Sequence, residues 1–183
     1  MFQALSDKVI SGLISLSVML FSSYEGNTAR FADLEITFLQ NRIIFKTALI
    51  DAFENDFEEL FRSGQTIRVI FTVEIRENGE LTSISDYEHS VLFDPLQQIY
   101  IVSLEDKKES LIIEDYLDLK NRISEFEYSQ HFPSSDTFQI QISANLPPLI
   151  LEASGNREFD TMMLWRFKTP RLRERISRPE NES

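Results

Sequence analysis

Apolar and polar side chains alternate along much of this chain, and period-two alternation is typical of half-buried strands. Alternating runs cover residues 31–39, 43–47, 67–76, 81–93, 98–104, 138–146 and 159–167. Turn residues separate neighbouring runs: Gln40-Asn41 follows the first, Asn78-Gly79 the third and Asp94-Pro95 the fourth. Because strands joined by such short turns are antiparallel, the pattern predicts an antiparallel sheet structure.

Two segments change to the helical period. In the first, a helix from Leu49 to a terminating Gly64 is predicted by apolar residues on one face (Leu49, Phe53, Phe57, Leu60, Phe61). In the second, a four-turn amphipathic helix is predicted by spacings of 4, 3, 4 and 3 between Ile112, Tyr116, Leu119, Ile123 and Phe126.

Strands with one apolar face need a second layer to cover that face. The predicted fold is therefore mainly β (α+β): an antiparallel two-layer β-sandwich of about seven strands with two amphipathic helices. A parallel arrangement is disfavoured because these strands alternate instead of being apolar on both sides.

The predicted domain organisation has four parts. Residues 1–23 are a signal peptide or N-terminal membrane anchor, 24–30 a linker, 31–168 the β-sandwich domain and 169–183 a basic and polar C-terminal tail. The run Val9 to Phe21 is uncharged and apolar. It is shorter than the about 20 residues of a membrane-spanning helix but suits the hydrophobic region of an export signal. A buried N-terminal helix is the alternative.

The composition disfavours some partners and excludes some kinds of reactive or metal-binding site. The 183 residues include 18 Lys+Arg and 30 Asp+Glu, a net charge of −12 that disfavours nucleic acid as a partner. There is no cysteine, and His89 and His131 are the two histidines, which excludes thiol chemistry and three-histidine metal sites. Asp86, Glu88, His89 and Asp94 lie close in sequence but match no calcium loop.

No phosphate-binding glycine loop, nucleophile elbow or zinc-protease motif occurs in the sequence. We therefore expect no catalytic residue, no cofactor and no bound metal. The candidate interaction residues are the basic set Lys168, Arg171, Arg173 and Arg175, together with Pro147 and Pro148. The basic residues suit an acidic partner or an anionic membrane surface, and the alternative is a solvated terminus. The prolines suit a docking segment or a rigid crossover between sheets.

The order of elements resembles the bacterial family catalogued as domain of unknown function 4390. The resemblance covers residues 31–167 and rests on Ser63-Gly64, the strand Thr66 to Arg76, Tyr100, the Leu146-Pro147-Pro148-Leu149 segment and Trp165. It implies a small exported or membrane-attached protein and supplies no catalytic residues.

The leading hypothesis is a non-catalytic, periplasmic or membrane-attached cell-envelope domain that acts through protein–protein interaction. The alternative is a small-ligand or lipid carrier with a gap between the sheets lined by Phe45, Phe71, Phe138 and Trp165. A third hypothesis, a hydrolase that uses carboxylates, requires two acidic groups converging in one cleft.

Overall fold

The computed structural model of the chain describes residues 26–151, 157–166 and 169–178. Strands dominate, and the helices are short. The elements are β1 (Arg30–Phe31), β2 (Glu35–Phe38), β3 (Arg42–Ile50), α2 (Phe57–Phe61), β4 (Ile67–Glu77), β5 (Glu80–Asp94), β6 (Ile99–Leu104), β7 (Glu109–Ile113), α3 (Tyr116–Ser124), β8 (Glu125–His131), β9 (Thr137–Asn145), β10 (Leu149–Leu151), β11 (Arg157–Phe159), the 3-10 helix η2 (Thr161–Leu164) and β12 (Arg171–Ser177).

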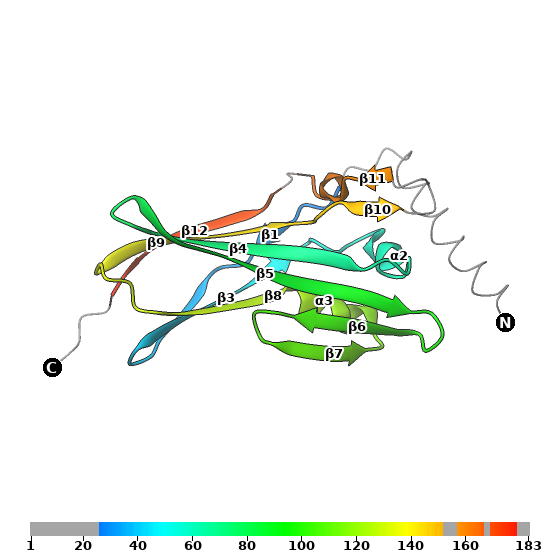
Figure 1. Ribbon diagram of the computed structural model, residues 1–183, viewed down its shortest axis with the longest axis horizontal. Coiled ribbons are helices and arrows are strands. Elements are labelled where there is room, and N and C mark those ends of the chain that lie inside the picture. The colour runs from blue at the N-terminus through cyan, green and yellow to red at the C-terminus, as the bar shows by residue number, and fades with distance from the viewer. Residues whose placement is uncertain (1–25, 152–156, 167–168, 179–183) are drawn as a thin grey trace.

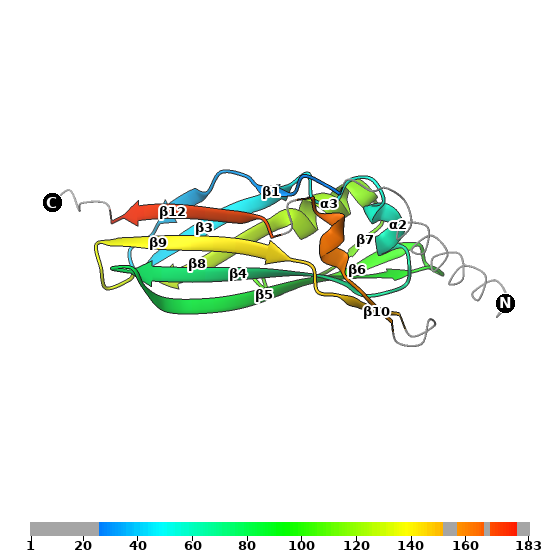
Figure 2. The ribbon, with the colours of Figure 1, turned by 90° about the horizontal axis from the view of Figure 1, so that it is seen from above.

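The larger sheet has six antiparallel strands in the order β12-β9-β4-β5-β6-β7. In the four-stranded sheet, β3 pairs with β1, β2 and β8, and β10 pairs with β11 in a separate small sheet. Strands β12 and β7 are the two edges of the larger sheet (Figure 1), while α2 and α3 lie toward the same end of the molecule in both views (Figure 2).

The inner faces of the two larger sheets pack against each other through aromatic side chains. Phe45 on β3 meets Phe138 on β9 edge-on at 6.3 Å between ring centroids, and Phe71 on β4 stacks on Phe126 of β8 at 4.6 Å. These four rings are all buried. The predicted antiparallel sandwich is therefore confirmed, although the predicted strand number was too low.

The turn at residues 78–79 is as predicted. Asn78 and Gly79 have φ of 52° and 87°, which joins β4 to β5 in a tight hairpin. The β2–β3 hairpin also turns at Gln40-Asn41, closed by a 2.8 Å bond from Leu39 N to Arg42 O. Both turns were predictable because their backbone requirements are local.

The predicted helix over residues 49–64 is wrong in most of its length. Strand β3 runs on to Ile50, and the helix α2 contains only Phe57–Phe61. Asp51 and Asn55 both have φ of 55°, a left-handed conformation that interrupts a right-handed helix. The apolar residues predicted for the buried face are nevertheless buried, because loop, strand and helix all turn them toward the same core.

The second predicted helix is correct only in its middle. Its observed part, α3, begins after Asp115, whose side chain accepts a hydrogen bond from Asp118 N at 3.0 Å. Leu119 and Ile123 are buried as expected, but Ile112 belongs to β7 and Phe126 to β8. Strand residues at both ends of the helix happened to continue its spacing.

Residues 159–167 and the predicted C-terminal tail also differ from expectation. Residues 161–164 form the 3-10 helix η2, and the strand predicted there ends at Phe159. Residues 171–177, predicted as solvated tail, form the edge strand β12. Leu172 and Ile176 face inward opposite Ile142 and Phe138, and this apolar alternation recruits the segment to the sheet.

The predicted linker is part of the folded domain from residue 26 onward. Asn27 is buried, and its backbone forms a parallel bridge with Trp165. Its side-chain amide donates to the carbonyl oxygens of Ala52 and Glu54 at 3.1 and 3.0 Å. The apolar run Val9 to Phe21 lies outside the described residues.

Candidate interaction surface

Three of the predicted interaction residues lie together on β12. Arg171, Arg173 and Arg175 alternate with inward-facing residues, so all three project from the outer face of the larger sheet. All three are exposed. Alternate residues of a strand are roughly 6.6–6.8 Å apart, so these side chains form a regularly spaced row, which we call the arginine ladder. Lys168 lies outside the described residues.

The surroundings leave the arginine ladder charged. Its cross-strand neighbours on β9 are neutral: Ser143 faces Arg171, Gln141 faces Arg173 and Gln139 faces Arg175. Arg173 donates to Gln141 Oε1, and no carboxylate among the described residues lies within 4.0 Å of any of the three guanidinium groups. A local cationic strip therefore stands on a chain whose net charge is −12.

A hollow of about 360 Å³ adjoins one end of the arginine ladder. Arg175, Gln139 and Arg76 form one cross-strand row along its wall, on β12, β9 and β4. Arg76 is paired with Glu74 at 3.1 Å, so Arg175 contributes the unneutralised charge. A guanidinium group suits planar carboxylates because it can donate two parallel hydrogen bonds.

The two prolines are not part of this surface. Pro147 and Pro148 connect β9 of the larger sheet to β10 of the small one, between the buried Leu146 and Leu149. Thr161 Oγ1 lies 2.9 and 2.7 Å from the carbonyl oxygens of Leu146 and Pro147, which share its single hydroxyl proton. These bonds and the burial on both sides fit a rigid crossover.

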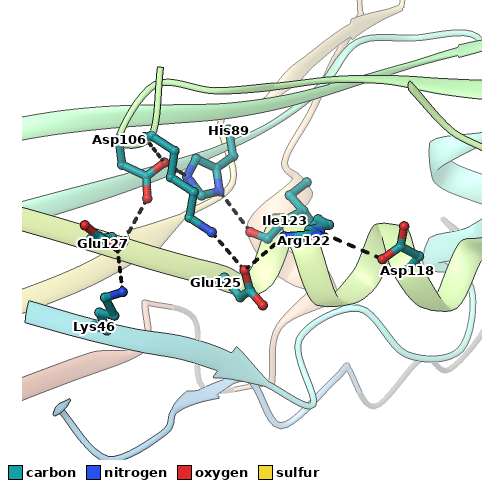
Figure 3. A network of polar contacts seen from close by, with 9 residues as sticks. Lys46, His89, Asp106, Asp118, Arg122, Ile123, Glu125 and Glu127 are labelled. Carbon is teal, nitrogen blue, oxygen red and sulfur yellow. Dashed lines mark hydrogen bonds and ion pairs between the residues drawn. The ribbon is translucent and has the colours of Figure 1, made fainter. Parts of the chain in front are cut away.

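A second polar constellation lies inside the sandwich, between β5, α3 and β8 (Figure 3). The imidazole of His89 is fully buried, with Nδ1 3.0 Å from Ile123 O and Nε2 2.9 Å from Asp106 Oδ1. A carbonyl oxygen can only accept, so Nδ1 carries a proton. Asp106 also accepts from Lys107 N and Glu127 N, each at 2.8 Å.

The electrostatics of this pair follow from its contacts. Burial by itself raises the pKa of the Asp106 carboxyl, but the hydrogen bond and charge of His89 and the two backbone N–H groups outweigh burial and hold that pKa below its usual range. Both ring nitrogens are thus engaged inside the protein, and the pair ties β5 to the β6–β7 turn and to β8.

Two lysine–glutamate pairs lie beside the buried pair, and Figure 3 labels one of them, Lys46 with Glu127. Lys46 Nζ lies 3.0 Å from Glu127, and Lys107 Nζ lies 2.8 Å from Glu125. The hydrogen bond and charge of Glu127 raise the pKa of the Lys46 ammonium. These four side chains line a surface hollow of about 360 Å³ whose lysines are already neutralised.

The acidic group near His89 does not assemble as a metal site. His89 faces the interior, whereas Asp86, Glu88 and Asp94 lie at positions of β5 on the opposite face. Within the described ranges, no group of three or more His, Cys, Asp or Glu side chains has the geometry to hold a metal ion.

The aromatic residues predicted to line a ligand gap are buried in contact with other rings. Besides the contacts of Phe45, Phe71 and Phe138 given above, Trp165 lies 6.3 Å from Phe53, and its Nε1 donates to Ala52 O at 2.9 Å. Aromatic neighbours thus fill the space beside each of the four, which favours a packed interior at these positions.

Comparison with known proteins adds no identity: the chain matches no protein-family profile, no curated protein and no solved structure. Among the helices of the described residues, none has the length and apolarity needed to cross a bilayer. Sequence reasoning singled out the arginines but missed the His89–Asp106 pair. The two residues are 17 positions apart, and only the fold brings them together.

Proposed function

We propose that this chain is a non-catalytic binding domain that acts through protein–protein contact, with the arginine ladder as its recognition surface. The observation that carries the proposal is the row of three exposed, unneutralised guanidinium groups on an edge strand of an otherwise acidic protein. Like charges held side by side repel one another, so a ligand that brings carboxylates to them relieves that repulsion.

The ligand class follows from the geometry of β12. Among the described strands β12 pairs only with β9, and β1 lies against it without pairing, so its other edge keeps unpaired backbone groups for an added strand. An extended segment has the same two-residue repeat as β12, so acidic residues at alternate positions would stand opposite the arginines. The proposed partner therefore presents an extended segment with Asp or Glu at every second position.

We place this function in the cell envelope, on the periplasmic side of the membrane. The support is the apolar run Val9 to Phe21 and the resemblance of residues 31–167 to a family of exported or membrane-attached proteins. Cell fractionation combined with N-terminal sequencing tests the location. A full-length protein recovered only from the cytosol would contradict it.

A peptide titration tests the recognition surface. One fluorescent peptide carries glutamate at alternate positions, and a second has the same composition with its glutamates contiguous. We expect the alternating peptide to bind more tightly, and added salt to weaken it because exposed ion pairs are screened. Replacing all three ladder arginines by glutamine should weaken binding by roughly 3- to 160-fold, since each exposed charge pair contributes about 0.2–1 kcal/mol.

A charge-matched variant is the control. Arg42→Gln, Arg68→Gln and Arg122→Gln remove three exposed positive charges from parts of the protein away from β12 and should leave binding nearly unchanged. Equal losses in the two triple variants would mean that only net charge matters. Equal affinity for the two peptides would refute strand addition. Ladder-dependent binding to anionic phospholipid vesicles, without peptide binding, would assign the surface to a membrane instead.

A further inference from the structure

The hollow beside Arg175, which we call the donor hollow, is lined by hydrogen-bond donors. Its polar side chains are two guanidinium groups, two amides and a hydroxyl, from Arg76, Arg175, Asn78, Gln139 and Thr137. Each of them can donate a hydrogen bond, and none of the described residues that line the hollow is acidic. By contrast, glutamates line the hollows beside Lys46, Lys108 and Lys120. The donor hollow is therefore suited to an anion, on a chain whose net charge is −12.

Three adjacent strands and a turn supply these donors from several sides. Arg175 on β12, Gln139 on β9 and Arg76 on β4 stand in one cross-strand row, and Figure 2 shows these strands side by side. Neighbouring strands are about 4.7–4.9 Å apart, so the backbones of the two arginines are roughly 9–10 Å apart with a neutral residue between them. Thr137 lies two residues before Gln139 on the same face of β9, and Asn78 comes from the β4–β5 turn.

Two glutamates of β4 lie close to the donor hollow, and each has a partner of its own. Glu77 accepts a hydrogen bond from Ser135 N at 2.8 Å. Glu74 accepts from Arg76 at 3.1 Å and so competes with any anion for that guanidinium group. A guanidinium group has five N–H donors, so Arg76 keeps donors beyond the one that Glu74 occupies.

We propose that the donor hollow binds a phosphoryl group, either of the free phosphate ion or of a phosphate ester. A phosphoryl group presents at least three acceptor oxygens and a charge of about −1.5 to −2, so it can accept from guanidinium, amide and hydroxyl donors together. A carboxylate has two oxygens in one plane, and a single guanidinium group can satisfy both. The volume of about 360 Å³ lies within the range of small-molecule sites, roughly 300–1,000 Å³, and leaves room for the rest of an ester.

The overall charge of the protein limits the ligand further. A net charge of −12 repels an extended polyanion, so the expected ligand carries an isolated phosphoryl group and is not a nucleic acid.

The donor hollow shares Arg175 with the arginine ladder but differs from it in its other members. Arg171 belongs only to the ladder, and Arg76 only to the donor hollow. Arg76→Gln should therefore weaken phosphate binding and leave the peptide titration unchanged, whereas Arg171→Gln should do the reverse. Failure of either proposal would thus be recognised separately from failure of the other.

Titration of the full chain with inorganic phosphate, followed by nuclear magnetic resonance of the backbone amides, tests the site. Sodium chloride keeps the ionic strength constant, because salt screens exposed charges. We expect saturable shifts centred on Gly79 and Gln139, which line the donor hollow. O-phosphoserine and acetate are the other two probes, and acetate should bind most weakly. Tighter binding of O-phosphoserine than of phosphate would assign the site to an ester, and the reverse order would assign it to the free ion.

Two conservative variants should change the affinity for phosphate in opposite directions. Gln139→Glu places a carboxylate between the two arginines and should abolish binding. Glu74→Gln removes the competitor for Arg76 and should tighten binding by about fivefold, the change that about 1 kcal/mol produces. Glu88→Gln is the matched control, because it removes the same charge from the outer face of β5, beside Arg68, and should leave binding nearly unchanged.

The same amide spectra establish that each variant is folded. Absence of saturable shifts at the donor hollow, or acetate binding as tight as phosphate binding, would overturn the proposal. Undiminished phosphate binding in Gln139→Glu, or equal effects of Glu74→Gln and Glu88→Gln, would overturn it as well.

Discussion

Removing the carboxylate of Asp106 should destabilise the protein strongly although the residue lies on a turn. In Asp106→Ala, the buried His89 Nε2 and the part-buried N–H groups of Lys107 and Glu127 lose their hydrogen-bond partner. A buried polar group left without a partner costs about 1–3 kcal/mol, and breaking a buried ion pair costs about 3–5 kcal/mol. We expect a loss of about 4 kcal/mol in unfolding free energy at neutral pH, against a total of about 5–15 kcal/mol for a typical domain.

Acid should reduce the difference between the variant and the parent protein. The folded-state pKa of Asp106 is lowered, so the stability it contributes is complete above the unfolded-state value of about 3.9 and is lost as pH falls through the folded-state pKa. Asp106→Ala lacks this contribution at every pH. The gap in unfolding free energy should therefore narrow below about pH 4.

Urea unfolding followed by the fluorescence of the single tryptophan, Trp165, measures both effects. Lys46→Ala is the control, because it breaks a neighbouring pair whose side chains are 53 and 35% exposed. Such a pair contributes at most about 1 kcal/mol. A loss in Asp106→Ala no greater than in Lys46→Ala, or a gap that stays constant into acid, would refute the reasoning.

Two further substitutions test the contacts of Trp165 and of Gly26. Trp165→Phe keeps a buried ring but removes the indole donor to Ala52 O, and should lower the unfolding free energy by about 1–3 kcal/mol, measured by calorimetry. Gly26→Ala should cost more than Gly79→Ala, although both residues have positive φ. A Cβ at Gly26 would lie 2.8 Å from Arg166 N, whereas none of the atoms around Gly79 is within 4 Å. Equal melting temperatures for the two alanine variants would show that the close approach is relieved without cost.

Local patterns were most reliable where the energetic requirement is local. The hairpin at Asn78-Gly79 was predictable because these residue types tolerate the positive φ that the turn needs. The helix predicted from Leu49 failed because Asp51 and Asn55 adopt left-handed conformations, which their residue types permit but do not enforce. The buried face was predicted correctly in both cases, since burial depends on the side chain more than on the backbone.

The candidate functional features also differ in how far the sequence alone could reveal them. Arg171, Arg173 and Arg175 could be identified as a basic cluster, but their alternation with Leu172 and Ile176 was not recognised as a strand pattern. The His89–Asp106 pair could not be found at all from the sequence. It depends on contact between segments that are distant along the chain.

By itself, therefore, the sequence determined the strand-rich class, the turns and the residues that avoid water, because alternation and turn preferences act over a few neighbouring residues. Tertiary structure alone decided that β12 and β7 become the two edge strands of the larger sheet among the described strands, and that a buried imidazole meets a carboxylate. These outcomes come from the sum of many weak contacts between remote segments, and that sum is fixed only when the two layers pack.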